Sequence, residues 1–171
     1  MVTLNTYTEM RIYMLKKYII IFLVSMVPLL ELRGAIPISQ AFQLPLLESY
    51  IVCIIGNMVP VPFIYFFARK VLEWGKDKKY IGEFFTFCIE KGHKGGVKLK
   101  EKAGKGLFVA LMLFVGIPLP GTGAWTGVLA ASFLDMGFKE SVIAVLCGVL
   151  IAGLIMGAIS VGLFGAIFSF M

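Results

Sequence analysis

Residues 106–134 read GLFVALMLFVGIPLPGTGAWTGVLAASFL and contain no Asp, Glu, Lys or Arg. A helix needs about 20 apolar residues to cross a bilayer, so this run is long enough for one crossing. The segment Pro-Leu-Pro-Gly-Thr-Gly at 118–123 cannot continue a helix, because proline lacks a backbone donor and glycine is a poor helix former. We therefore predict two short apolar arms, 106–117 and 124–134, that are separated by a non-helical break.

Two further charge-free runs indicate a membrane protein. Residues 49–68 lie uncharged between Glu48 and Arg69, and residues 141–171 follow Glu140 without a charge. Charged residues make up 15% of the 171 residues, against about 25% in a soluble domain. A large soluble protein can bury one such helix, but three runs in so short a chain leave too little polar sequence to cover them. The prediction is an all-α integral membrane protein.

A second broken helix is predicted near the N-terminus. Residues 18–30 are apolar, Glu31 and Arg33 then interrupt the apolar sequence, and residues 38–47 resume it. Neither apolar arm is long enough to span a bilayer by itself. We therefore expect the two arms to surround a break over residues 31–37.

The chain divides into two similar halves within a single transmembrane domain. Each break is followed by a predicted spanning helix, over residues 49–68 in the first half (about 15–70) and about 141–165 in the second half (about 106–171). One net crossing per half would turn the second half upside down, as in inverted-repeat transporters. We predict two inverted halves over residues 1–171, each a re-entrant broken-helix hairpin plus a transmembrane helix.

The positive charge is concentrated between the halves. Residues 69–105 hold eleven Lys and Arg and five Asp and Glu, which accounts for the net charge of +6. Basic loops stay on the inner side, so we predict a cytoplasmic loop over 71–105 in a multi-pass protein of the cell membrane. Apolar residues from Ile81 to Ile89 have helical spacing, which predicts an amphipathic helix on the membrane surface. Residues 1–17 are expected to be loosely ordered or interfacial, and the side of the N-terminus stays open.

Glu31 and Arg33 are the candidate chemical groups of the first break. An ionisable side chain at membrane depth is costly and usually has a role. Glu31 can carry a proton, and Arg33 can hold a phosphate or a carboxylate at two points. The alternative is a mutual ion pair that only fixes the break.

The second break offers backbone amides in place of charges. Free amides at the start of a helix bind anions, and here they would come from Gly121 to Gly123. The alternative is a tight turn that only allows the helices to pack. If the two breaks meet at the midplane of the membrane, they form one site. The predicted substrate-binding residues are Arg33, Gly34, Asn57, Gly121, Thr122, Gly123, Trp125 and Thr126, with Glu31 as the proton-coupling residue.

The sequence contains no set of residues typical of an enzyme or a metal site. The single His93 has no neighbouring ligand, and the three cysteines are far apart. We therefore predict no catalytic residue, no metal and no cofactor. The aromatic residues of the basic segment suit a membrane interface, so no nucleic-acid partner is expected. The predicted partners are the lipid bilayer, a small-molecule or lipid substrate, and a second copy of the chain through the GxxxG pair Gly153 and Gly157, for which internal packing is the alternative.

Three blocks of the chain resemble the signature blocks of the small multidrug export protein family. They are Glu31-Leu-Arg-Gly-Ala-Ile-Pro37, Gly56-Asn-Met-Val-Pro-Val-Pro-Phe63 and Gly116-Ile-Pro-Leu-Pro-Gly-Thr-Gly-Ala-Trp-Thr-Gly127. The resemblance covers about residues 18 to 165. That family is distantly similar to the DedA superfamily, which the resemblance links to polyprenyl-phosphate lipids, proton-dependent phenotypes and two facing re-entrant hairpins. The second break here lacks the arginine of the DedA pattern.

These observations together predict a proton-coupled secondary transporter of a small anion, a lipid phosphate or a drug-like solute. Export of cationic drugs, with Glu31 neutralising the substrate, is the other transport hypothesis. The alternative of a different class is a non-transporting membrane scaffold or assembly factor, in which Gly153 and Gly157 matter more than Glu31.

Overall fold

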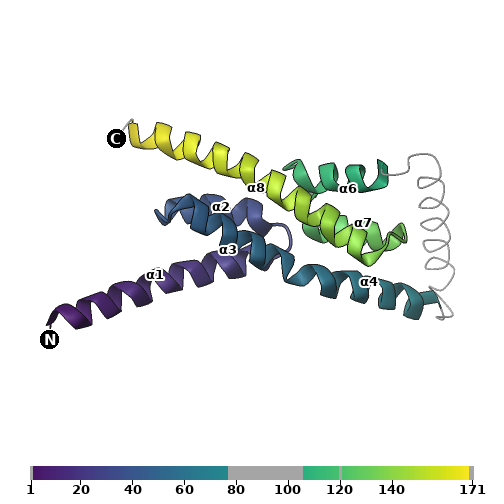
Figure 1. Cartoon of the computed structure of the whole chain (residues 1–171), viewed down its shortest axis with the longest axis horizontal. Helices are drawn as coiled ribbons and strands as arrows, with labels where there is room; N and C mark the ends of the chain where they lie inside the picture. The colour runs from purple at the N-terminus through teal and green to yellow at the C-terminus, as the bar shows by residue number, and fades with distance from the viewer. Residues whose placement is uncertain (1, 77–105, 120, 170–171) are drawn as a thin grey trace. The chain divides into compact units, whose positions relative to one another are not determined.

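The computed structural model of the protein describes residues 2–76, 106–119 and 121–169. Every regular element in these ranges is an α-helix, so the all-α prediction is confirmed (Figure 1). The helices are α1 (Val2–Met26), α2 (Glu31–Ala41), α3 (Leu46–Met58), α4 (Pro60–Lys76), α6 (Gly106–Gly116), α7 (Ala124–Phe133) and α8 (Phe138–Ser169). The amphipathic helix predicted around residues 81–89 lies outside the described residues.

The chain forms two compact units, and each is described by itself. The first unit comprises Met1–Asn57 and Ala152–Met171, and the second comprises Met58–Ile151. The chain passes from one unit to the other near the junction of α3 and α4, and again within α8.

The first unit is built on close contact between α1, α2 and α3. Helices α1 and α2 pack along each other, and the apolar residues Leu32, Ala35 and Ile36 of α2 are buried. Helix α3 approaches α1 at Gly56, where an added Cβ would lie 2.7 Å from the Phe22 carbonyl oxygen. Only glycine permits two helix backbones to come this close.

Two glycines of α8 in this unit, Gly153 and Gly157, lie against side chains of their own chain. A Cβ added to Gly153 would lie 2.2 Å from the ring of Tyr50, and one added to Gly157 would lie 3.8 Å from Leu46. These contacts give the internal-packing alternative a geometric basis. The homodimer through Gly153 and Gly157 stays a prediction.

The second unit repeats this close approach between α6 and α8. A Cβ added to Gly148 of α8 would lie 2.7 Å from the Met112 carbonyl oxygen and 2.6 Å from Val115. Helix α4 packs against α7, and the Tyr65 hydroxyl of α4 donates a hydrogen bond to the Met136 carbonyl just after α7.

The turns that follow α2 and α7 have the same hydrogen-bond pattern. After α2, Gln43 has a φ of 57° and the N–H of Leu44 donates to the carbonyl five residues back, at 3.0 Å. After α7, Asp135 has a φ of 54° and the N–H of Met136 donates to the carbonyl five residues back, at 3.0 Å. Both turns are Schellman motifs, which satisfy the last carbonyls of a helix.

The helices that come next also begin alike. Ser49 in α3 and Ser141 in α8 each donate Oγ to the carbonyl four residues back, at 2.9 Å. Both serines are fully buried, and each follows a glutamate, Glu48 or Glu140. In both halves, therefore, a helix ends in a Schellman turn, and the next helix carries a buried serine in its first turn whose hydroxyl bonds to the backbone.

The structure corrects the position of the first break. It lies over residues 27–30, whereas residues 31–37 were predicted. The N–H of Glu31 donates to the carbonyl of Val27 at 3.0 Å, which starts the helical ladder of α2. Pro28 interrupts the helix instead, because proline has no N–H to donate and disfavours the helical conformation in the residue before it.

Four further boundaries differ from the predicted ones. Residues 2–17 are helical as part of α1, so the expectation of loose order was wrong. The spanning helix predicted over 49–68 is interrupted at Val59, because Pro60 and Pro62 remove two backbone donors. Helix α4 then continues past residue 70 to Lys76, and the last helix is longer than 141–165. The break between α6 and α7 lies where it was predicted.

Two segments are long and apolar enough to cross a membrane, Leu46–Ala68 and Phe138–Leu163. Less than half of each most apolar window is buried inside the protein, 44% and 39%. Phe63 and Leu154, on these segments, are 72% and 66% exposed. A core helix of a soluble protein would be mostly covered, so these outward apolar side chains favour contact with lipid.

We predict that Gly56→Ala and Gly148→Ala each destabilise the protein by about 1–3 kcal/mol, because the added methyl group must push two helix backbones apart. The matched control is Gly162→Ala, where no described atom lies within 4 Å of the added Cβ. Thermal unfolding of the detergent-solubilised variants measures the effect. Wild-type melting temperatures for the first two variants would contradict the packing described above.

Candidate functional site

The first break holds backbone angles that residues with side chains rarely adopt. Leu29 and Glu31 have φ values of 75° and 49°. A left-handed conformation costs a residue with a side chain about 1–2 kcal/mol, so packing around the break has to maintain it. Strained backbone of this kind is often found at functional sites, which makes the start of α2 a candidate.

Glu31 is a buried carboxyl group at this strained position. It is 4% exposed, and the other buried polar residues in the described ranges are serines and one asparagine. It stands in the first turn of α2, where unpaired N–H groups favour a negative charge. Arg33 is half-buried and interacts electrostatically with Glu31. Gly34, in the same turn, lies close to the side chain of Leu30. A Cβ added at Gly34 would lie 3.2 Å from that side chain.

Asn57 supplies a second buried polar group in the same unit. It is 2% exposed, and its Oδ1 has no hydrogen-bond partner within the part of the chain that is described. It lies two residues before the interruption at Val59 and next to the close approach at Gly56. Leaving a buried acceptor unpaired costs about 1–3 kcal/mol, so this oxygen is available to a bound donor.

The second break is held together by its own threonines. The hydroxyl of Thr122 donates to the carbonyls of Ile117 and Leu119, both at 2.9 Å, and its N–H donates to Leu119 at 3.2 Å. Thr126 donates its hydroxyl to Gly123 at 3.4 Å. These bonds agree with the alternative of a turn that allows packing, because the amide of Thr122 is already used.

The glycines of this break adopt conformations that other residues avoid. Gly121 and Gly123 have φ values of 80° and 137°, in the left-handed half of backbone space. Gly121 is exposed, with no described atom within 4 Å of an added Cβ, whereas Gly123 is buried and precedes α7.

Trp125 lines a groove that was not predicted from the sequence. The groove lies within the second unit, has a volume of about 620 Å³ and falls in the size range of small-molecule sites. Its lining is almost entirely apolar, and Lys70 is the charged residue among those that line it. Besides Trp125, the lining residues are Pro62, Phe63, Ile64, Phe66, Phe67 and Lys70. The spacing of Phe63, Phe66, Phe67 and Lys70 on one helix could have indicated this face.

The structure thus places the predicted residues in two groups. Glu31, Arg33, Gly34 and Asn57 belong to the first unit, whereas Gly121, Thr122, Gly123, Trp125 and Thr126 belong to the second. That the two breaks form one site stays a prediction. Across the described ranges, no three His, Cys, Asp or Glu side chains are grouped closely enough to hold a metal ion.

A comparison with protein families finds one match, and it covers most of the chain. The family described as "Putative small multi-drug export protein" matches residues 31–155, from Glu31 at the start of α2 to the middle of α8. No curated protein and no solved structure matches the chain. The family description and the two apolar segments point to a membrane protein, and the description suggests a transporter rather than an enzyme. Because the match runs from the start of α2 to the middle of α8 and covers well over half of the sequence, the chain belongs to this family of small multidrug export proteins.

Proposed function

We propose that the protein is a secondary transporter that moves a small amphipathic solute with an anionic group, coupled to a proton through Glu31. The observation that carries the proposal is the burial of Glu31 beside Arg33 at a strained helix break. A buried carboxylate is costly unless a positive partner compensates it. The family description supports transport as the class of function.

The Glu31–Arg33 pair suggests how a proton and an anion are coupled. When Arg33 binds an anionic group, Glu31 loses its compensating charge, and a proton restores the balance. The proton and the anion would therefore bind together and move in the same direction. For a cationic solute the opposite holds, because the cation would replace the proton on Glu31.

Three short helices support the proposal that both broken elements are re-entrant, whereas α1, the first arm of the first element, has 25 residues. Helices α2 and α6 have 11 residues each and α7 has 10. At about 1.5 Å per residue they measure roughly 16 Å, about half of the roughly 30 Å hydrocarbon core. The shared Schellman turns and buried serines support two similar halves. We propose that these halves are inverted in the cell membrane, with the basic segment 71–105 on the cytoplasmic side.

The aromatic groove of the second unit supports the substrate class. Its rings offer flat apolar faces, and Lys70 in its lining offers a positive charge. A solute with an apolar body and an acidic group matches both features, whereas Lys70 repels a cation.

We predict that Glu31→Gln abolishes proton-driven flux in proteoliposomes but leaves exchange of substrate for substrate, because the uncharged side chain no longer cycles a proton. The assay uses anionic amphiphiles, lipid phosphates and cationic dyes under an imposed pH gradient. Glu9→Gln, which neutralises an exposed carboxyl of α1, is the matched control.

The direction of proton movement separates the outcomes of this assay. Protons that accompany an anion support the proposal, whereas protons that run opposite to a cation support cationic drug export. If no compound moves, or if Glu31→Gln transports like wild type, the coupling role of Glu31 is refuted. The alternative of a non-transporting membrane scaffold then becomes the better explanation.

We predict that Asn57→Val lowers transport without lowering stability. The fully buried Val149 occupies the equivalent place in α8, one residue after Gly148, so valine fits this helix position. The change removes an unpaired buried oxygen that costs about 1–3 kcal/mol. Thermal unfolding and flux are measured on the same preparation. Wild-type flux would show that Asn57 is not part of the site.

We predict that Lys70→Gln weakens binding of an anionic aromatic dye about two- to fivefold, as expected for the loss of one exposed charge contact. Binding of an uncharged dye should not change. Lys139→Gln, which removes an exposed lysine of the same unit outside the groove, is the control. Equal effects on both dyes would contradict a role for the charge.

A further inference from the structure

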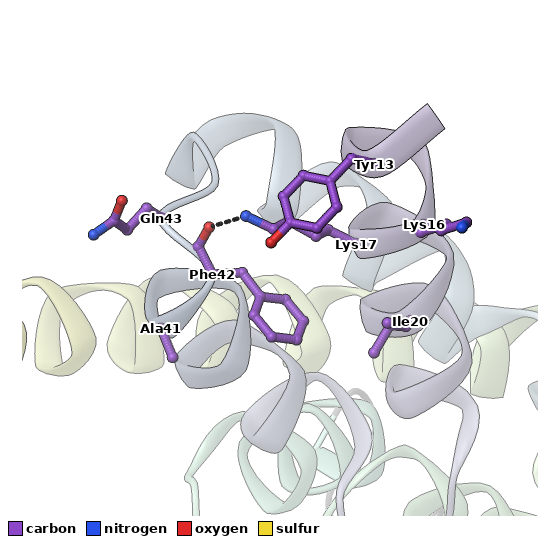
Figure 2. A pocket seen from close by; sticks show the side chains of 7 residues that line it. All are labelled: Tyr13, Lys16, Lys17, Ile20, Ala41, Phe42 and Gln43. Carbon is purple, nitrogen blue, oxygen red and sulfur yellow. Dashed lines mark hydrogen bonds between the residues drawn. The ribbon is translucent and has the colours of Figure 1, made fainter. Parts of the chain in front are cut away.

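A second pocket lies within the first unit, between α1 and the turn that follows α2 (Figure 2). Its volume is about 410 Å³, and it opens to the outside. None of its residues belongs to the predicted transport site. Its lining combines lysine and aromatic residues with apolar ones, which is the composition of a site for an amphipathic ligand.

Lys17 is the best-positioned charge of this pocket. Its ammonium group donates a hydrogen bond of 3.0 Å to the carbonyl oxygen of Phe42. It also lies 4.6 Å from the centre of the Tyr13 ring and 5.9 Å from that of the Phe42 ring. An ammonium group has three donors, so two remain for a ligand after the bond to Phe42. The carbonyl and the two rings hold the charge in place before any ligand arrives.

The other side of the pocket is apolar. Figure 2 shows the Phe42 ring and Ile20 on the same side of the Lys17–Phe42 hydrogen bond, and Ala41 also lines the pocket. Lys16 also lines the pocket, and its side chain projects outward from α1, away from Phe42 (Figure 2). No carboxylate is among the described residues that line the pocket.

The pocket lies near the points where two apolar segments of the chain begin. Lys17 directly precedes the apolar run that starts at residue 18, and Phe42 lies four residues before the apolar span Leu46–Ala68. Next to Lys17, the Tyr18 hydroxyl donates a hydrogen bond to the Glu48 carboxylate. Lysine and tyrosine at the ends of apolar helices mark the boundary between lipid and water.

We propose that this pocket binds one anionic phospholipid, with the phosphate on Lys17 and the glycerol and upper acyl chain against Ile20, Ala41 and Phe42. Phosphate is the only charged group that every anionic phospholipid presents at this depth, and the apolar side favours a lipid over free phosphate. This site is separate from the transport site, so its test does not depend on transport.

The experiment is a titration of the detergent-purified chain with short-chain phosphatidylglycerol, followed by native mass spectrometry. Phosphatidylcholine with the same chains and inorganic phosphate are the competing probes. We expect Lys17→Gln to weaken phosphatidylglycerol binding about fivefold, in the range of a charge-assisted hydrogen bond, and Lys17→Arg to restore it. Lys139→Gln, which removes an exposed lysine of the other unit outside the aromatic groove, should bind as wild type.

A second variant keeps the test independent of folding. Lys17 also caps the end of α2, so its loss can disturb the turn, whereas Ala41→Leu fills the pocket and leaves Lys17 and Phe42 unchanged. We expect Ala41→Leu to weaken lipid binding as well. Wild-type binding by both Ala41→Leu and Lys17→Gln, or displacement of the lipid by equimolar inorganic phosphate, would overturn the proposal.

Discussion

The contact on which each unit depends is the close approach of two helix backbones at a glycine. At Gly56 and at Gly148 the space for a Cβ is occupied by the main chain of the neighbouring helix. In a lipid environment there is no hydrophobic drive to bring helices together, so close van der Waals contact has to do so. The breaks, the Schellman turns and the buried serines follow in the same order around both contacts. Each half therefore builds the same small framework with different side chains.

The difference between the halves is chemical rather than architectural. The first half places a carboxyl, a guanidinium and an unpaired amide oxygen around its framework, in Glu31, Arg33 and Asn57. The second half has valine in the place of Asn57, and its threonines bond to their own backbone.

The wrong boundaries have a common physical origin. Charge was used to place the first break, yet Glu31 begins a helix because a helix N-terminus stabilises a negative charge. Proline was the better signal at Pro28 and at Pro60, where backbone donors are missing. Where proline and glycine coincide, as before α7, the break was predicted correctly. The groove beside Trp125 was missed, because its other residues come from α4, and packing partners cannot be read from local spacing.

Apolar run length and missing backbone donors are local properties, so the amino-acid pattern was enough to predict the membrane class, the all-α architecture and the order of helix, break and helix. The same pattern identified Glu31, Arg33 and Asn57 as candidates. Three facts came from the folded chain: Glu31 is buried in a helical turn, Asn57 Oδ1 lacks a partner among the described residues, and Lys17 reaches the carbonyl of Phe42. These facts depend on which segments pack together, and side-chain volume and backbone approach decide that across long sequence separations.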